Sequence, residues 1–314
     1  MNSCQGRWRI PSLSGSGMDP DMVEVSSDFD SGNCGNVQLI AENTLEISIA
    51  PDCAGTQFQT HSRTWFYFSV TNVPRETKLN FVIRNMGQQK PLFNHGMKPV
   101  IRIGQTAKWD RIPGAVHFSS ISKQHFQIQF SHKFLCAKQS TSYFAFCYPH
   151  TYTECQALLN KLEARYGVET ILEDDQNGPA EPESEAPPSA KANSGTRDTK
   201  KRRRRKIYFH RACLAKSLQN RRVDLLTITN AKKSDKNKFE SQSISKVIHS
   251  NPSLFPLSTC REGGTETSCW KFEGKPIVFV SARVHPGETP SSFTFLGFLE
   301  FILDEKDPRA CRLR

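Results

Sequence analysis

The chain has 314 residues, of which 37% are hydrophobic and 23% are charged, and this length suits two domains of ordinary size. No apolar run approaches the eighteen or so residues of a membrane-spanning helix, and residues 1–20 lack the apolar stretch of a secretory signal. We therefore expect a soluble intracellular protein with no membrane partner and a disordered N-terminus over residues 1–22.

The net charge indicates which partners the chain prefers, and the cysteine pattern indicates the redox state of its thiols. The formal net charge of +11 points to acidic partners, and much of the excess lies in the run at residues 200–206. No stacking aromatic residues interrupt that run, so a solvated linker or a nuclear import signal is favoured over a nucleic-acid surface. The ten cysteines form no CxxC pairs, so we expect reduced thiols.

An antiparallel, sandwich-like β domain is expected over residues 23–150. Short runs rich in β-branched and aromatic residues alternate with turn residues, and they occur at residues 45–49, 65–70, 79–83, 126–130 and 143–146. Period-two alternation at this spacing is typical of sandwiches and barrels.

A connecting helix follows over residues 151–170. Cys155, Leu158, Leu159 and Leu162 recur at helical spacing, and Thr153 is the expected N-cap. Residues 171–206 then turn to Pro, Glu, Ser and Ala before the basic run. This composition cannot build a core, so we expect a disordered insertion.

Residues 207–314 are expected to form the N-terminal part of an α/β domain. The runs at residues 223–229 and 276–282 are predicted strands, and the second is apolar throughout, which indicates burial on both faces in a parallel or mixed sheet. Residues 230–273 are polar and without periodicity, so we expect a long loop there.

The predicted strand at residues 276–282 leads into His285-Pro286-Gly287-Glu288 and then a helical pattern. We expect Thr289 to be the N-cap and Pro290 the first helical residue, with Phe295, Phe298, Leu299 and Ile302 on one stripe. Such a turn can converge an imidazole and a carboxylate, which zinc accepts as ligands. The bare HxxE spacing is common by chance, but its place after a strand favours a site.

The run SARVHPGETPSS at residues 281–292 resembles the zinc-binding segment of the cytosolic carboxypeptidases, a branch of the carboxypeptidase A-like metallopeptidases. The resemblance covers the chain from about Val25 onward except for the linkers. It also rests on segments at residues 31–33, 65–68, 96–99, 144–149, 155–162, 207–210, 222–229 and 297–303.

This resemblance implies Zn²⁺ as cofactor, with His285 and Glu288 as two of its ligands. It further implies removal of glutamate from protein C-termini or polyglutamate branches, including branch points, with tubulin or other glutamylated acidic proteins as partners. In that family zinc polarises the scissile carbonyl, a glutamate acts as the base, and an arginine receives the substrate carboxylate.

The family's third zinc ligand, its base and its arginine lie beyond the position of Arg314, so no catalytic residue within this chain is expected. His210, His249 and Arg283 are not nominated as substitutes, because a lone His near a helix or loop is usually a surface residue. Arg283 lies beside the turn and can pair with a carboxylate there, but nothing in the sequence distinguishes such a pair from ordinary solvation. We therefore expect the isolated chain to be inactive.

We expect a cytoplasmic location, and the basic run is also compatible with the nucleus. Two other interpretations compete with the zinc carboxypeptidase. In the first, the chain is a non-catalytic, tubulin-binding or interaction product of the same family. In the second, it binds nucleic acid through residues 201–206, which the lack of stacking aromatics disfavours.

Overall fold

The computed structural model describes residues 6–10, 22–87, 90–122, 125–167, 206–231, 241–242, 269–270, 272 and 274–314. They fall into two compact units. The first, here called the β unit, contains Met1–Cys155 and Ser281–Phe295. The second, the hairpin unit, contains Gln156–Val280 and Leu296–Arg314. No helix among the described residues is long and apolar enough to cross a membrane.

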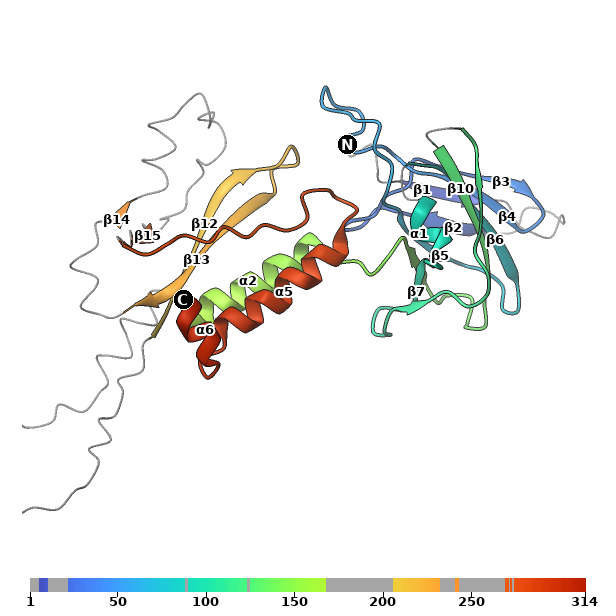
Figure 1. The fold of residues 1–314 in the computed structure, drawn as a ribbon. Coiled ribbons are helices and arrows are strands. Elements are labelled where there is room, and N and C mark those ends of the chain that lie inside the picture. Colours follow the sequence, from blue (N-terminus) through green and yellow to red (C-terminus); the bar gives the residue numbers. More distant parts are fainter. Residues whose placement is uncertain are drawn as a thin grey trace, which may run out of the picture. The chain divides into compact units, whose positions relative to one another are not determined.

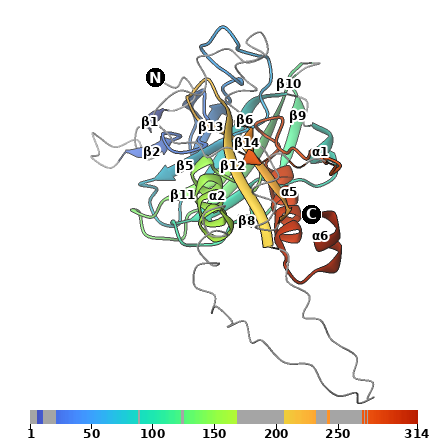
Figure 2. The same ribbon diagram turned by 90° about the vertical axis from the view of Figure 1, so that its left-hand side faces the viewer.

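Two sheets build the β unit (Figures 1 and 2). The first has the order β1-β2-β5-β11-β7-β8, with bounds Arg7–Ile10, Val23–Ser26, Tyr67–Thr71, Ser142–Ala145, Val100–Ile103 and Asp110–Arg111. The second has the order β3-β4-β6-β10-β9, with bounds Asn36–Ala41, Thr44–Ser48, Lys78–Gly87, His125–Lys133 and His117–Ser120. The short helix α1, Lys90–Asn94, follows β6.

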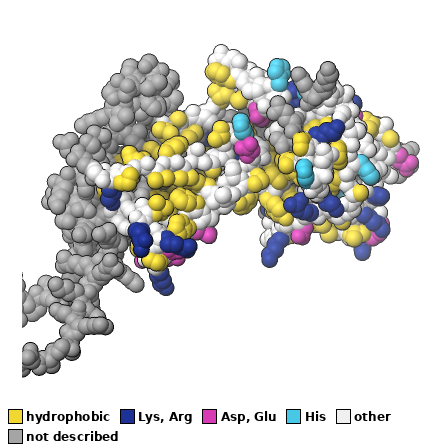
Figure 3. Space-filling model, viewed as in Figure 1, with side chains coloured by type: hydrophobic (Ala, Val, Ile, Leu, Met, Phe, Trp, Pro, Cys, Tyr) yellow, Lys and Arg dark blue, Asp and Glu magenta, His cyan; other side chains and the backbone are white. Residues whose placement is uncertain are grey.

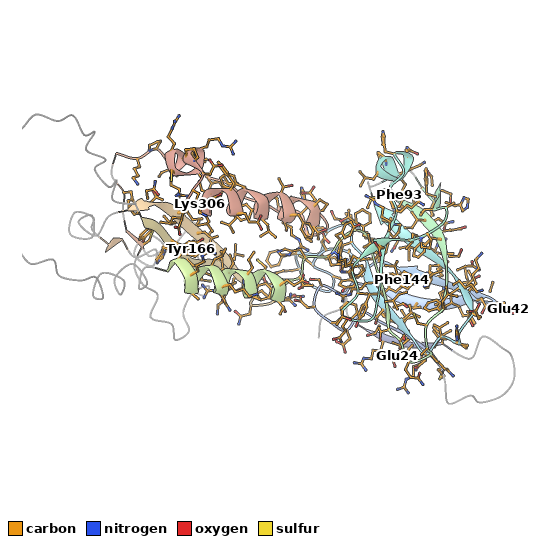
Figure 4. All side chains as sticks on the ribbon, turned by 90° about the horizontal axis from the view of Figure 1, so that it is seen from below. Glu24, Glu42, Phe93, Phe144, Tyr166 and Lys306 are labelled. Atoms are coloured by element: carbon orange, nitrogen blue, oxygen red, sulfur yellow. The ribbon has the colours of Figure 1, made fainter. Side chains whose placement is uncertain are left out.

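Phenylalanines from both sheets fill the space between them. Phe68 of β5 and Phe144 of β11 meet Phe81 of β6 and Phe130 of β10, with ring centroids 4.9 Å apart for Phe81–Phe144 and 6.0 Å apart for Phe130–Phe144. Figure 4 shows Phe144 in the interior of this unit. All four side chains are buried, and each contributes about 1.5–3 kcal/mol through removal of apolar surface from water. The β unit therefore has a core of its own.

The strands expected from period-two alternation are present in the β unit, with ends shifted by one to four residues. Two details differ from expectation. β4 pairs with β6 in parallel, although every other pairing in the two sheets is antiparallel. Arg7–Ile10 forms β1 against β2, so the expectation of disorder over residues 1–22 is wrong at these four residues. Ile10 is buried in this strand and contributes an apolar contact. The expectation of disorder rested on the Ser- and Gly-rich composition of the segment as a whole, which does not reveal this single contact.

An antiparallel hairpin, parts of two helices and the whole of a third helix form the hairpin unit. The hairpin joins β12, Lys206–Lys216, to β13, Arg222–Ala231, and Figure 1 shows helix α2 alongside it. The helices are α2, Tyr152–Tyr166, α5, Thr289–Leu303, and α6, Pro308–Leu313. The hairpin turn is closed by the Ser217 N–H, which donates to Arg221 O at 2.8 Å, with Asn220 at φ 58°.

Charged side chains fix α2 to the hairpin. Arg211 of β12 donates through Nε to Asp224 of β13 at 3.0 Å and through Nη1 to Asn160 of α2 at 2.6 Å. Gln156 donates to the same carboxylate at 2.7 Å. Burial alone would raise the pKa of Asp224, but the hydrogen bonds from Arg211, Gln156 and Arg222 outweigh it, so the pKa is lowered. The buried ion pair of Arg211 and Asp224 is also hydrogen-bonded to its neighbours, and these bonds offset the cost of removing both charges from water.

The predicted helix at residues 151–170 is observed as α2, but its cap differs. The Glu154 N–H donates to Thr151 Oγ1 at 3.1 Å, and the Thr151 N–H donates to Glu154 Oε2 at 2.7 Å. These reciprocal bonds form a capping box, so Thr151 and not Thr153 is the N-cap. The Thr153 N–H instead donates to Asp30 Oδ2 at 2.8 Å.

The predicted buried strand at residues 276–282 is not formed. These residues have no regular secondary structure and no strand partner among the described residues, and Ile277 and Phe279 are 93% and 77% exposed. A strand buried on both faces depends on neighbouring strands and covering helices, which its own apolar sequence cannot supply.

The remaining strands of this unit also differ from a parallel sheet. β12–β13 and the two-residue pair β14, Ser241–Gln242, with β15, Cys269–Trp270, are antiparallel. β14 and β15 lie inside the expected loop at residues 230–273, of which residues 232–240 and 243–268 lie outside the described residues, as does the insertion up to residue 205.

Candidate metal centre

A tight turn presents the two predicted zinc ligands. The Glu288 N–H donates to His285 O at 3.1 Å, which closes residues 285–288 into a β-turn. Ser291 fixes the end of the turn, since its N–H and its hydroxyl both donate to Glu288 O, at 3.1 and 2.7 Å. His285 and Glu288 are both exposed. The turn therefore leaves an imidazole and a carboxylate open to solvent within four residues.

Gly287 allows this turn to lie directly on the β unit. Gly287 is buried, and a Cβ added to it would come within 2.5 Å of Thr64 Oγ1 and 3.2 Å of Thr64 Cβ. No real side chain tolerates such a contact without movement of one partner. The requirement for glycine here comes from close approach to the β unit and not from an unusual φ.

Arg283 braces the turn from behind. Its Nε donates to Pro286 O at 3.1 Å, its Nη1 donates to His150 O, and its own N–H donates to Ser291 Oγ at 2.9 Å. Arg283 adopts a left-handed φ of 57°, which is uncommon for a residue with a side chain. The guanidinium therefore links the carbonyl of Pro286 in the turn to the carbonyl of His150. These contacts to backbone carbonyls differ from the carboxylate pair or ordinary solvation considered for Arg283 from the sequence.

Helix α5 begins at Thr289, one residue earlier than expected. The Thr289 hydroxyl donates to Tyr148 O at 2.8 Å and lies 3.0 Å from Cys147 Sγ, so it anchors the helix to the β unit. Thr289 is fully buried. The expectation that Thr289 is the N-cap is therefore wrong, because its hydroxyl satisfies a carbonyl of another segment.

The loop at residues 51–64 carries two residues next to the turn. Its base is closed by the Asp52 N–H donating to Ser62 O and the Thr60 N–H donating to Asp52 O, both at 3.0 Å. Burial raises the pKa of Asp52, and the nearby His285 works in the opposite direction. Neither Asp52 nor Thr64 had a sequence signal, because their role arises from a contact across more than 200 residues.

The donor set fits zinc in part. An imidazole nitrogen and a carboxylate oxygen are both normal zinc ligands, and a catalytic site takes three protein ligands and a water. Within the described residues, no group of three or more His, Cys, Asp or Glu side chains is positioned to hold a metal ion. His285 and Glu288 therefore suit two positions of such a site.

The other residues considered from sequence lie elsewhere. His210 of β12 is buried in the hairpin unit, where its ring stacks on Tyr208 with centroids 6.4 Å apart. It also hydrogen-bonds Cys269. Burial would raise the pKa of that thiol, but its hydrogen bonds with His210, Thr227 and Tyr208 lower it. His249 lies outside the described residues.

Comparison with known proteins identifies both parts of the chain. Residues 25–147 match the family model described as the cytosolic carboxypeptidase N-terminal domain, and residues 201–314 match the one described as zinc carboxypeptidase. These two matches place the chain among the zinc carboxypeptidase-type proteins with an N-terminal β domain. The chain belongs to the cytosolic carboxypeptidase family.

Curated relatives agree with this assignment. The chain is 36% identical to cytosolic carboxypeptidase-like protein 5 of Homo sapiens, over 92% of this chain and 31% of that protein. It is 34% identical to the Danio rerio protein of the same name, over 92% and 30%, and 28% identical to human cytosolic carboxypeptidase 6, over 91% and 42%. The chain thus spans about a third of the length of the first two relatives.

Proposed function

We propose that this chain is part of a zinc metallocarboxypeptidase that removes glutamate from polyglutamate branches or glutamate C-termini of acidic proteins such as tubulin, in the cytoplasm. The observation that carries the proposal is the exposed His285 and Glu288 in one β-turn, held on the β unit of a chain that belongs to the cytosolic carboxypeptidases.

His285 and Glu288 would hold the metal, and bound zinc supplies Lewis acidity and lowers the pKa of a bound water. The chain's other residues keep those two side chains in place. Arg283 and Ser291 bond the backbone on both sides of the turn, and Gly287 permits its contact with Thr64. A turn fixed in this way limits the reorganisation needed when a metal binds, which favours binding.

The test uses the longest protein that the gene encodes, expressed with His285→Ala, Glu288→Ala or neither change. We expect each substitution to abolish stoichiometric zinc, measured by elemental analysis, together with glutamate release from polyglutamylated tubulin. Glu300→Ala on the exposed side of α5 is the control and should leave both unchanged. Full zinc and full release in either ligand variant would refute the assignment.

For the 314-residue chain alone we propose weak zinc binding and no peptidase activity, because two ligands rarely retain a catalytic zinc. Stoichiometric zinc after dialysis, with glutamate release that a chelator stops, would contradict this.

A second candidate function is tubulin binding without catalysis, which would need no metal and only the β unit, whose core is its own. Co-sedimentation with microtubules that persists in the His285→Ala variant while the longest protein releases no glutamate would support this candidate over the enzyme.

A further inference from the structure

A hollow of the β unit lies far from the turn in sequence and has no part in the proposed metal chemistry. It has a volume of about 540 Å³, within the range of ordinary ligand pockets, and it is open to solvent. It lies between α1 and β8, and its lining includes Leu92, His95, Met97, Lys98, Arg111 and Ile112.

The backbone holds the two sides of this hollow together. The Ile112 N–H donates to Pro99 O at 3.0 Å, and Val100 of β7 pairs with Arg111 of β8. Gly96 has a φ of 82° and ends the turn after α1, which brings Met97 and Lys98 to the lining. The segment at residues 96–99, singled out in the sequence, thus forms one wall.

Every charged side chain that lines the hollow is basic. Lys98 donates to Gly114 O at 2.6 Å, which uses one of its three N–H groups. The side chain of Arg111 makes no ion pair or hydrogen bond with any residue that the structure describes. Its neighbour Asp110 does not line the hollow, because successive strand residues point to opposite faces.

His95 adds an oriented polar group. Its Nδ1 lies 2.7 Å from Pro91 O, and because a carbonyl oxygen can only accept, Nδ1 carries the proton. Nε2 is therefore the ring nitrogen left for a ligand. Leu92, 42% exposed, Met97 and Ile112 supply apolar surface between the polar groups.

Figure 3 shows this combination on the face of the β unit that carries α1 and β7, where Lys, Arg and His side chains adjoin hydrophobic ones. Two cations around an apolar floor complement a chain that carries carboxylates and an aliphatic side chain. The lining holds no Phe, Tyr or Trp on which a base could stack, which disfavours a nucleic acid.

We propose that this hollow is a docking site for an acidic peptide segment, whose carboxylates pair with Lys98 and Arg111 while an apolar side chain rests on Leu92 and Met97. Docking here requires neither zinc nor His285. Peptide binding can therefore be observed even if the proposed peptidase activity is absent, and peptidase activity can be observed even if the peptide does not bind here.

The test measures binding by the 314-residue chain of a short fluorescein-labelled glutamate-rich peptide containing one leucine, followed by fluorescence anisotropy in the presence of a chelator. We expect Lys98→Gln with Arg111→Gln to weaken binding roughly tenfold at low salt, since each exposed charge pair contributes about a severalfold gain in affinity that salt screens. Leu92→Ser should weaken the leucine-containing peptide but not an all-glutamate one.

Arg75→Gln with Lys78→Gln is the matched control, because it removes the same charge from exposed positions of the same unit. Equal loss in the control and site variants would show general electrostatic attraction and overturn the proposal. No loss in the site variant, or no binding at all, would also overturn it. If a labelled oligothymidylate bound as tightly as the peptide and lost affinity in the site variant, the occupant would be a nucleic acid and the proposed acidic peptide would be wrong.

Discussion

At the scale of single residues, Gly287 decides whether the candidate metal turn can lie on the β unit. We expect Gly287→Ala to cost about 1–3 kcal/mol of unfolding free energy, because the new Cβ would fall 2.5 Å from Thr64 Oγ1. Urea unfolding followed by tryptophan fluorescence measures this. Thr64→Ala in the Gly287→Ala background should recover part of the loss, since it removes the overlapping hydroxyl.

Gly297 of α5 is the matched control for that substitution. A Cβ at Gly297 meets nothing within 4 Å, so Gly297→Ala should stabilise the helix by up to about 1 kcal/mol. Equal effects at the two glycines would show that close approach to Thr64 does not matter.

His132 of β10 is a second residue whose environment sets a measurable property. It is buried among Phe134 and Phe144, with ring centroids 4.8 and 5.6 Å away, and neither ring nitrogen has a hydrogen-bond partner within the described part of the chain. Burial lowers the pKa of His132 below its ordinary value of 6.5. The folded chain therefore binds a proton less readily than the unfolded chain.

As pH falls below about 6.5, the unfolded chain gains a proton at this position that the folded β unit does not, so stability decreases until the folded pKa is passed. We expect His132→Phe to stabilise the β unit more at about pH 5 than at about pH 7.5, by removing this term. Thermal unfolding at both pH values measures it. An identical gain at the two values would contradict the explanation.

At the scale of elements, α2 begins with the reciprocal bonds of Thr151 and Glu154. Thr151→Ala should cost about 1 kcal/mol, because two amide protons at the helix start lose their partners or their geometry. Thr153→Ala should change stability by less than about 0.5 kcal/mol, since Thr153 contributes its backbone and not its hydroxyl to the described bonds. Hydrogen exchange of the first-turn amides, with urea unfolding, distinguishes the two. A larger effect at Thr153 would restore the original cap.

At the scale of the whole molecule, the apolar segment at residues 276–280 has no strand partner among the residues that the structure describes. Ile277, Val278 and Phe279 are 93%, 67% and 77% exposed. An exposed apolar segment of this composition is a template for strand pairing between molecules. We expect the 314-residue chain to self-associate through it.

Ile277→Thr with Phe279→Thr should reduce that self-association several-fold, as followed by light scattering at increasing concentration, with little change in far-UV circular dichroism. Leu39→Thr with Ile40→Thr, at exposed positions in β3, is a matched control that should have a smaller effect. Equal effects would show that general surface hydrophobicity and not the unpaired segment drives association.

The sequence by itself determined the β domain, helix α2 and the H-P-G-E turn. Alternation such as that in β4 and β10 places every second side chain in a core whatever the topology, and proline and glycine restrict the turn locally. The resemblance at residues 281–292 added the family, which the comparisons bear out.

Only the tertiary structure decided which polar groups meet and which apolar runs are covered. The sequence pattern predicted Thr289 and Thr153 as helix caps. In the structure, the hydroxyl of Thr289 donates to the carbonyl of Tyr148. The N–H of Thr153 donates to the carboxylate of Asp30, and both acceptors come from distant segments. Residues 276–282 looked like a buried strand, but burial requires neighbours that a local pattern does not encode. Contacts between distant segments also place Asp52 and Thr64 beside the turn, because hydrogen bonding and close packing depend on position in space and not on spacing along the chain.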